Sequence, residues 1–318
     1  MRTGAAAGNA GYFHEAVCYD SDEHLLGVVV PFLLGGVAAG EPTVVALGER
    51  NAALVRAALP AGGPVIYLTG GDMYARPASA IRSYRRLLAD HVSAGAAQIR
   101  ILGELTPRAF GATWDWWARY ESAINHAYDE FPLWSMCAYD VGTTPAPVLD
   151  DVLRTHPRTA LPGGGHRPNR SYQEPAVYLG RSRRPVTDPI ELSPPRAVLA
   201  DPTPAEARQA VRAGVGGSLT DEERDGLVVA VSEMVSNARQ HGHGPIRMRL
   251  WSAADRVVVA VTDGGRGPAD PYAGLLPARR GDGGGLGLWI AHQSCSHVSL
   301  DHRDDEGFTV RLTAGNPP

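Results

Sequence analysis

Short apolar runs alternate with segments of helical periodicity before residue 156. Apolar runs of this length between polar turns are typical of strands, and apolar positions three or four residues apart are typical of amphipathic helices. The predicted strands are 15–19, 43–47, 65–68, 99–102 and 133–139, and the predicted helices are 22–39, 50–59, 78–93 and 113–130. This alternation predicts a three-layer α/β fold with a mainly parallel sheet.

The segment 156–204 interrupts this pattern. It holds ten of the 25 prolines and three consecutive glycines at 163–165. Because proline fixes φ and has no backbone donor, we predict an irregular tail and linker here. The predicted organisation is a first domain over 10–160, a linker over 161–194 and a second domain over 195–315.

A different order of elements follows the linker. The predicted strands are 196–199, 246–251, 257–262, 298–302 and 308–313, and the predicted helices are 203–214, 220–241 and 286–296. They predict a two-layer α+β sandwich with the helices on one face of the sheet. Thr220 and Glu223 have the spacing of a capping box, which fixes the start of the long helix.

Composition narrows the chemistry, because all 30 basic residues are arginine. The absence of lysine excludes a pyridoxal Schiff base, a Walker A loop, an ordinary protein kinase and a Ser-Lys hydrolase. A net charge of −4 gives no indication of a nucleic-acid partner. The apolar stretch 25–40 is too short for a membrane span, and three distant cysteines suggest reduced thiols. We therefore expect a cytoplasmic protein that binds neither membranes nor nucleic acid directly.

Two features of the second half suggest nucleotide chemistry. Glu233 and Asn237 lie one helical turn apart, and together they offer a base and a neutral oxygen ligand for Mg²⁺. Asp263 ends a predicted strand and could accept from an exocyclic amino group such as that of adenine. Taken singly, each feature is more typical of a solvated helix face or a simple Asp-Gly turn. The glycine-rich run 283–287 opens an apolar helix, whose free N–H groups favour anions.

Three motifs follow one another at consistent spacing in the second half. They are Glu233-x-x-x-Asn237-Ala238-x-x-His241-Gly242, Asp263-x-Gly265-x-Gly267 and Gly283-x-Gly285-Leu286-Gly287-Leu288. Together they resemble the N, G1 and G2 boxes of the Bergerat-fold (GHKL) ATPases, and above all the anti-sigma-factor serine kinases of the RsbW and SpoIIAB type. The resemblance implies a protein serine/threonine kinase with ATP and Mg²⁺ as cofactors.

The same resemblance implies a role for each matching residue. Glu233 would be the catalytic base, Asn237 the Mg²⁺ ligand and Asp263 the adenine contact. The other implied ATP-binding residues are His241, Gly265, Gly267, Gly283, Gly285, Leu286 and Gly287, together with the lid arginines Arg279 and Arg280. A histidine kinase with its own phosphoacceptor is not expected, because no two-helix dimerisation hairpin precedes this domain.

In the first half, His14, Cys18, Asp20 and His24 carry metal-ligand chemistry, but their spacing matches no standard zinc site and favours structural roles. Short motifs over residues 12–157 resemble the MEDS sensory domain, named for methanogens, methylotrophs and the DcmR regulator. They are His14-Glu15-Ala16, Gly40-Glu41-Pro42, Asp72-Met73, Pro77, Gly103-Glu104, Tyr120-Glu121, Asn125, Cys137-x-Tyr139-Asp140 and His156-Pro157. The resemblance implies a RecA-like sheet without a P-loop and a small-molecule signal. The candidate sensory residues are His14, Cys18, Glu104 and Cys137.

The two resemblances together predict a signalling protein in which a sensory domain controls a kinase domain. The implied partners are a sigma factor, an anti-sigma-factor antagonist that receives the phosphoryl group, and a second copy of the chain in a homodimer. Two alternatives remain open at this point. One is a non-catalytic, ATP-dependent switch that binds a sigma factor, and the other is an orphan ATP-binding sensor.

Overall fold

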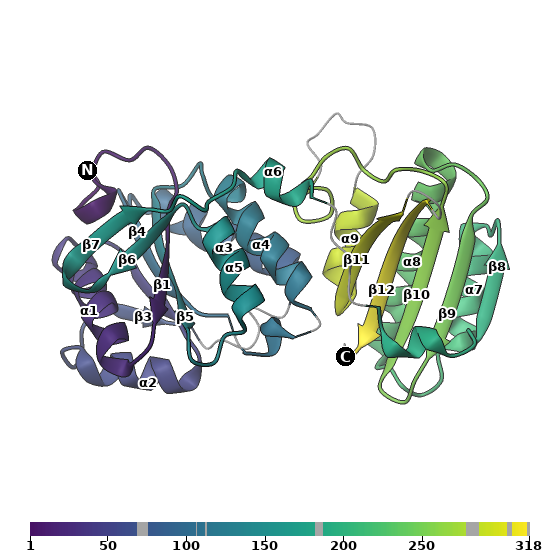
Figure 1. The fold of residues 1–318 in the computed structure, drawn as a ribbon, viewed down its shortest axis with the longest axis horizontal. Helices are drawn as coiled ribbons and strands as arrows, with labels where there is room; N and C mark the ends of the chain where they lie inside the picture. The colour runs from purple at the N-terminus through teal and green to yellow at the C-terminus, as the bar shows by residue number, and fades with distance from the viewer. Residues whose placement is uncertain are drawn as a thin grey trace. The chain divides into compact units, whose positions relative to one another are not determined.

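The computed structural model describes residues 1–68, 76–105, 107–111, 113–181, 187–277, 286–303 and 307–316. The chain divides into two compact units, each with its own sheet (Figure 1). The first unit comprises Met1–Ala75 and Ala80–Leu179, and the second comprises Arg76–Ser79 and Gly180–Pro318.

The first unit contains a mainly parallel sheet with the strand order β3-β2-β4-β5-β1-β6-β7. Its strands are β1 (Phe13–Tyr19), β2 (Thr43–Ala46), β3 (Val65–Tyr67), β4 (Ile99–Gly103), β5 (Leu133–Asp140), β6 (Arg158–Leu161) and β7 (Gly165–Pro168). Its helices are α1 (Asp22–Ala38), α2 (Glu49–Ala58), α3 (Pro77–Ser93), α4 (Trp114–Ala127), α5 (Ala146–Thr155) and α6 (Pro175–Leu179). Only β7 pairs in the antiparallel sense among these strands, so the predicted α/β class is confirmed.

Helices cover both faces of this sheet, as Figure 1 shows for α1 and α2 on one side and α3, α4 and α5 on the other. Successive side chains of a strand point to opposite faces. Phe13 and Val17 of β1 therefore pack into the core beneath α1 and α2. His14 directly follows Phe13, so it points to the opposite face, where it contacts Asn125 of α4.

The segment predicted to be an irregular tail contains two strands of the first sheet. β6 pairs in parallel with β1, and β7 pairs with β6 at the edge of the sheet. The prolines are tolerated because they lie at the boundaries of these elements. Pro168 ends the edge strand, and Pro175 occupies the first position of α6, where a missing N–H is least costly.

The second unit is a two-layer sandwich, as predicted. Its antiparallel sheet has the order β11-β12-β10-β9-β8. The strands are β8 (Ala197–Ala200), β9 (Arg247–Ser252), β10 (Arg256–Asp263), β11 (His297–Arg303) and β12 (Gly307–Gly315), and the helices are α7 (Pro204–Gly214), α8 (Asp221–His241) and α9 (Leu286–Ser294). The capping box of α8 is present: Thr220 Oγ1 accepts from the N–H of Glu223, and the Glu223 carboxylate accepts from the N–H of Thr220.

A buried stripe on α8 packs against one face of this sheet and against α7 and α9; its members include Leu227, Val231, Met234 and Ala238. The opposite face is covered in part by the short 3-10 helix Pro189–Leu192, whose Ile190 packs against Trp251, Val258 and Ala260. Two ion pairs fix this segment to the sheet. Arg256 binds Asp188 at 2.9 Å, and Arg311 binds Glu191 at 3.1 Å.

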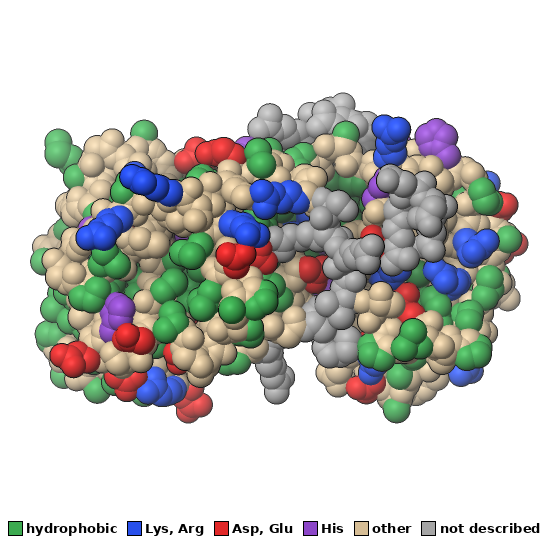
Figure 2. Space-filling view, viewed as in Figure 1, with side chains coloured by type: hydrophobic (Ala, Val, Ile, Leu, Met, Phe, Trp, Pro, Cys, Tyr) green, Lys and Arg blue, Asp and Glu red, His purple; other side chains and the backbone are tan. Residues whose placement is uncertain are grey.

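Acidic and basic side chains lie interspersed over the described surface on the face that Figure 2 shows. Among the described residues, no helix combines the length and the apolar character that crossing a membrane requires.

Candidate functional site

Glu233 and Asn237 project from the same side of α8, one turn apart. The buried stripe on the adjoining side of the helix fixes this orientation. Both side chains are half-buried, yet neither has a hydrogen-bond or ion-pair partner among the described residues. A carboxylate and a carboxamide held side by side without partners are available to a ligand.

The start of α9 lies directly against these two side chains. A Cβ atom at Gly287 would lie 2.9 Å from Glu233 Oε2 and 3.0 Å from Asn237 Nδ2. Glycine therefore lets the first turn of α9, which follows the exposed Leu286, approach both polar groups. The N–H groups of a first helical turn have no partner within the helix and attract anions. The structure thus brings together three of the predicted nucleotide-site residues.

Asp263, at the end of β10, is held in a fixed orientation. Its side chain is buried, and Oδ1 accepts a hydrogen bond of 2.6 Å from the N–H of Gly265. A Cβ atom at Gly242, just after α8, would lie 2.5 Å from the Asp263 carboxylate carbon. Among the described residues Oδ2 receives no hydrogen bond, so one carboxylate oxygen stays available for a donor such as an amino group.

Two further predicted residues lie near this strand end and helix end. Gly267 has φ +77°, and a Cβ atom there would lie 2.5 Å from the ring of Phe308, so only glycine fits. His241 is exposed at the end of α8. The predicted Arg279, Arg280, Gly283 and Gly285 lie outside the described residues.

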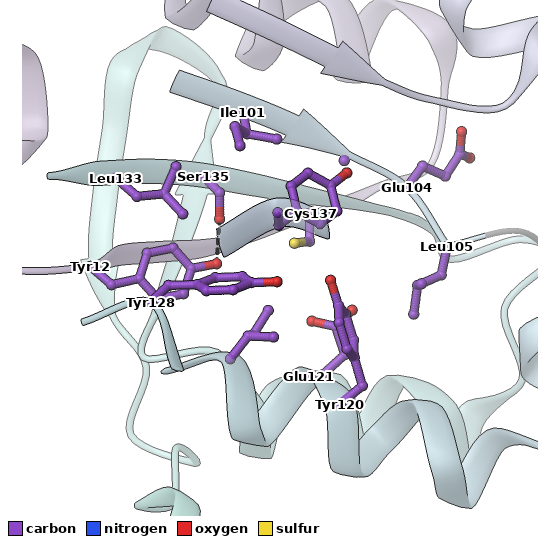
Figure 3. A pocket seen from close by; sticks show the side chains of 13 residues that line it. Tyr12, Ile101, Glu104, Leu105, Tyr120, Glu121, Tyr128, Leu133, Ser135 and Cys137 are labelled. Carbon is purple, nitrogen blue, oxygen red and sulfur yellow. Dashed lines mark hydrogen bonds between the residues drawn. The ribbon is translucent and has the colours of Figure 1, made fainter. Parts of the chain in front are cut away.

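The first unit contains a small pocket between its sheet and α4 (Figure 3). It is lined by Tyr12, Tyr84, Ile101, Gly103, Glu104, Leu105, Tyr120, Glu121, Ile124, Tyr128, Leu133, Ser135 and Cys137. Most of this wall is aromatic or aliphatic. At one end Glu104 accepts hydrogen bonds from the N–H of Gly48 and from Asn51, and burial raises the pKa of its carboxyl group.

Beside the pocket, four side chains with metal-ligand chemistry face one another. They are His14 from β1, Glu121 from α4, Cys137 from β5 and His156 just after α5, and their ligand atoms all lie within 4.8 Å of one another. His14 Nε2 lies 3.4 Å from Cys137 Sγ and 3.9 Å from Glu121 Oε2, and His156 Nε2 lies 3.5 Å from Glu121 Oε2. Three members are fully buried, and Cys137 is half-buried.

Burial determines the ionisation of this cluster. It raises the pKa of Glu121 to about 8, against the opposing effect of the Tyr139 hydroxyl. It lowers the pKa of His156 to about 4, against the opposing effect of the Val152 carbonyl. The pKa of His14 is also lowered, first by burial and then by His156. Both imidazoles are therefore neutral at pH 7.

The structure gathers only some of the predicted sensory residues. His14 and Cys137 belong to the cluster, and Glu104 lies in the pocket wall. Cys18 is four residues further along β1, about 13 Å at the rise of a strand, and lies outside the cluster. Asp20 and His24, the other members of the metal-ligand pattern near β1, pair with each other at 3.1 Å on the surface.

Glu121 and His156 were not predicted as site residues. The only sequence signal for them was their place in the short MEDS-like motifs Tyr120-Glu121 and His156-Pro157.

Each of the two units matches a known domain family. Residues 13–157 match the family model of the MEDS domain, the methanogen/methylotroph, DcmR sensory domain, and residues 199–314 match that of the histidine kinase-like ATPase domain. The chain therefore carries a MEDS sensory domain followed by a histidine kinase-like ATPase domain, which implies ATP binding. A comparison with curated proteins found no match to the chain.

Two solved structures are similar to part of the chain. One contains the RsbU and RsbW domains of Rv1364c from Mycobacterium tuberculosis, at 22% identity and a TM-score of 0.26, over 38% of this chain and 33% of that one. This chain thus spans about a third of that protein. The other is the histidine kinase domain of the E. coli osmosensor EnvZ, at 22% identity and a TM-score of 0.24, over 40% of this chain and 92% of that one. At these TM-scores neither likeness bears on function.

Proposed function

We propose that this chain is an ATP- and Mg²⁺-dependent protein serine/threonine kinase of the anti-sigma-factor type, controlled by its MEDS domain. One observation carries the proposal. Glu233 and Asn237, without partners of their own among the described residues, converge on the backbone of Gly287 at the start of α9. The partner in this proposal is an anti-sigma-factor antagonist, whose serine or threonine hydroxyl accepts the phosphoryl group.

The residues present fit a Mg²⁺-bound nucleotide. The first turn of α9 offers N–H groups to phosphate oxygens, because Gly287 has no side chain to block the approach. The Asn237 carboxamide oxygen is a suitable ligand for a hard cation. The oriented Asp263 carboxylate can accept from the adenine amino group. When bound, ATP would supply the phosphoryl group and Mg²⁺ would neutralise its negative charge.

Glu233 has the position of a general base in this proposal. Its carboxylate lies beside the place where the phosphates would meet α9, so it could take the proton of an incoming hydroxyl group. Asn237 stays close enough on the same helix face to hold the metal next to this oxygen. A positioned base contributes about 100- to 10,000-fold to the rate.

The test is a transfer assay with ATP labelled in its γ-phosphate and candidate antagonist proteins. We expect Glu233→Gln to lower transfer by about 100-fold or more while nucleotide affinity changes little. Glu222→Gln, an exposed change on the same helix, is the matched control and should leave transfer unchanged.

Transfer that survives in Glu233→Gln would remove this residue from the mechanism. If the wild-type protein moves no label yet binds a sigma factor only with ATP, the protein is a non-catalytic switch and the kinase proposal fails.

A further inference from the structure

The cluster of His14, Glu121, Cys137 and His156 has no part in the proposed phosphoryl transfer, since it lies inside the first unit. We infer that these four residues bind one divalent transition-metal ion of the zinc class.

The spacing of the four ligand atoms supports tetrahedral coordination. With zinc bonds of about 2.0–2.1 Å to nitrogen or oxygen and about 2.3 Å to sulfur, ideal tetrahedral angles put N and O about 3.3 Å apart and N and S about 3.6 Å apart. The observed separations are 3.4 Å for His14 Nε2 to Cys137 Sγ and 3.5 Å for His156 Nε2 to Glu121 Oε2. The third, from His14 Nε2 to Glu121 Oε2, is 3.9 Å. The remaining pairs lie within 4.8 Å of one another, so shifts of at most about an ångström would close the shell.

Both histidines already present the correct nitrogen. His156 Nδ1 lies 2.8 Å from the carbonyl oxygen of Val152, which can only accept, so Nδ1 carries the proton. His14 Nδ1 lies 2.9 Å from Asn125 Oδ1, and the Asn125 amide nitrogen donates to three backbone carbonyls, which fixes Oδ1 as the acceptor. Each Nε2 therefore directs a lone pair into the cluster. Histidine ligands of metals are oriented in this way by a hydrogen bond at the other ring nitrogen.

Two polar atoms of the cluster have no hydrogen-bond partner among the described residues. Glu121 Oε2 and His156 Nε2 are buried without a hydrogen-bond partner. Buried polar atoms are normally paired, and an unpaired atom calls for an explanation such as an ion. A cation at the centre of the cluster would satisfy both atoms at once.

The donor set selects the kind of ion. Two imidazoles, one thiolate and one carboxylate suit zinc, cobalt or ferrous iron, whereas magnesium and calcium prefer oxygen ligands alone. Glu121 and Cys137 also line the small pocket between the sheet and α4, and Figure 3 shows both side chains directed into it. The ion would thus lie in the pocket wall, where a small molecule with a donor atom could reach it.

Cobalt(II) substitution tests this site in the full-length protein. The chain is freed of metal with a chelator and titrated with Co²⁺ alone. We expect one equivalent to give the strong visible absorption of four-coordinate cobalt and a thiolate-to-cobalt charge-transfer band in the near ultraviolet. Zn²⁺ should abolish both signals by displacement.

The cysteine variants identify the ligand, because the chain has only three cysteines. Cys137→Ser should lose the charge-transfer band. Cys18→Ser is the matched control, since Cys18 is also half-buried and near β5 but outside the cluster, and it should keep the band. A wild-type protein without the band, or an unchanged band in Cys137→Ser, would overturn the inference.

Thermal unfolding provides a second test, which does not depend on whether Cys137→Ser folds. Zn²⁺ should raise the unfolding midpoint of the wild-type protein, and Glu121→Gln, a change of nearly equal volume, should weaken Zn²⁺ binding by at least about tenfold. Equal Zn²⁺ affinity in Glu121→Gln, or no effect of Zn²⁺ on the wild-type midpoint, would show a metal-free polar cluster. None of these measurements involves ATP, so they are independent of the proposed kinase function.

Discussion

The two candidate sites differ in how their polar side chains are held. In the first unit, four side chains from β1, α4, β5 and the end of α5 face one another inside the core, and hydrogen bonds orient both histidines. In the second unit, Glu233 and Asn237 come from a single helix and face a glycine backbone. The first arrangement thus has two of its side chains oriented by hydrogen bonds, whereas Glu233 and Asn237 have no such bonds among the described residues. Both arrangements leave polar atoms that a ligand could pair.

A third group of polar side chains, also in the first unit, has only a structural role. Arg100 and Glu41 form a buried ion pair, and Arg100 also donates to the Phe32 carbonyl and to Thr3 Oγ1. These groups satisfy one another, which is typical of a structural ion pair. The comparison teaches that the pairing of buried polar groups, more than their burial, distinguishes a structural cluster from a binding site.

The largest expected effect concerns the buried ion pair between Arg100 and Glu41. Arg100→Ala should lower the free energy of unfolding by about 3–5 kcal/mol, because it leaves the buried Glu41 carboxylate without its charged partner, with hydrogen bonds from the neutral Thr3 and Gln98. Chemical denaturation followed by circular dichroism measures this loss. Arg154→Ala breaks an exposed pair with Asp150 and should cost at most about 0.5 kcal/mol. A loss of similar size in both variants would contradict the distinction.

The second-largest expected effect concerns the proposed nucleotide site of the second unit. Gly287→Val should weaken ATP binding at least about tenfold, or about 1.4 kcal/mol, since its side chain would occupy the space beside Glu233 and Asn237. Titration calorimetry with ATP and Mg²⁺ measures the affinity. Gly216→Val is the control, because a Cβ atom at Gly216 meets nothing within 4 Å. Unchanged affinity in Gly287→Val would show that the nucleotide binds elsewhere.

The smallest effect concerns an intermediate case, the ion pair between Asp188 and Arg256 on the outer face of the second sheet. Burial raises the pKa of Asp188, but hydrogen bonds from Arg256 and from the N–H of Ile190 outweigh it, and the net pKa lies below 3.8. The stabilisation is thus present above the unfolded pKa and disappears as the pH falls through the lower, folded value.

We expect Asp188→Asn to cost about 1 kcal/mol at pH 7. The difference from the wild-type protein should shrink below about pH 4, which urea denaturation at several pH values would show. Asp255→Asn removes a more exposed partner of the same arginine and should have a smaller effect. A difference that is constant down to pH 2 would refute the electrostatic origin.

The helical period was enough to predict much of the second site. It puts Glu233 and Asn237 on one side of α8, beside the buried residues, and the capping box sets where the helix starts. The approach of Gly287 to these side chains could not be obtained in this way, because it depends on how α8 packs against α9.

The four-residue cluster in the first unit was harder to predict from the sequence. His14 and His156 are far apart in the chain, and they meet because β1 lies between β5 and β6 in the sheet. Hydrophobic patterning predicts strands but not their order, so it could not distinguish Cys137, on the neighbouring strand, from Cys18. β6 was not predicted, for a related reason. The prolines around it indicate irregular backbone from local geometry, whereas β6 is stabilised by its pairing with β1, which is distant in the sequence.

The attachment of Asp188 and Glu191 to the second sheet shows that the second domain begins before its first strand. Ile190, between the two anchors, packs against Trp251, Val258 and Ala260 on the outer face of the sheet. A fragment that began at β8 would lose both ion pairs and would expose these apolar side chains to water. A fragment made to study the ATPase domain by itself should therefore begin before Asp188.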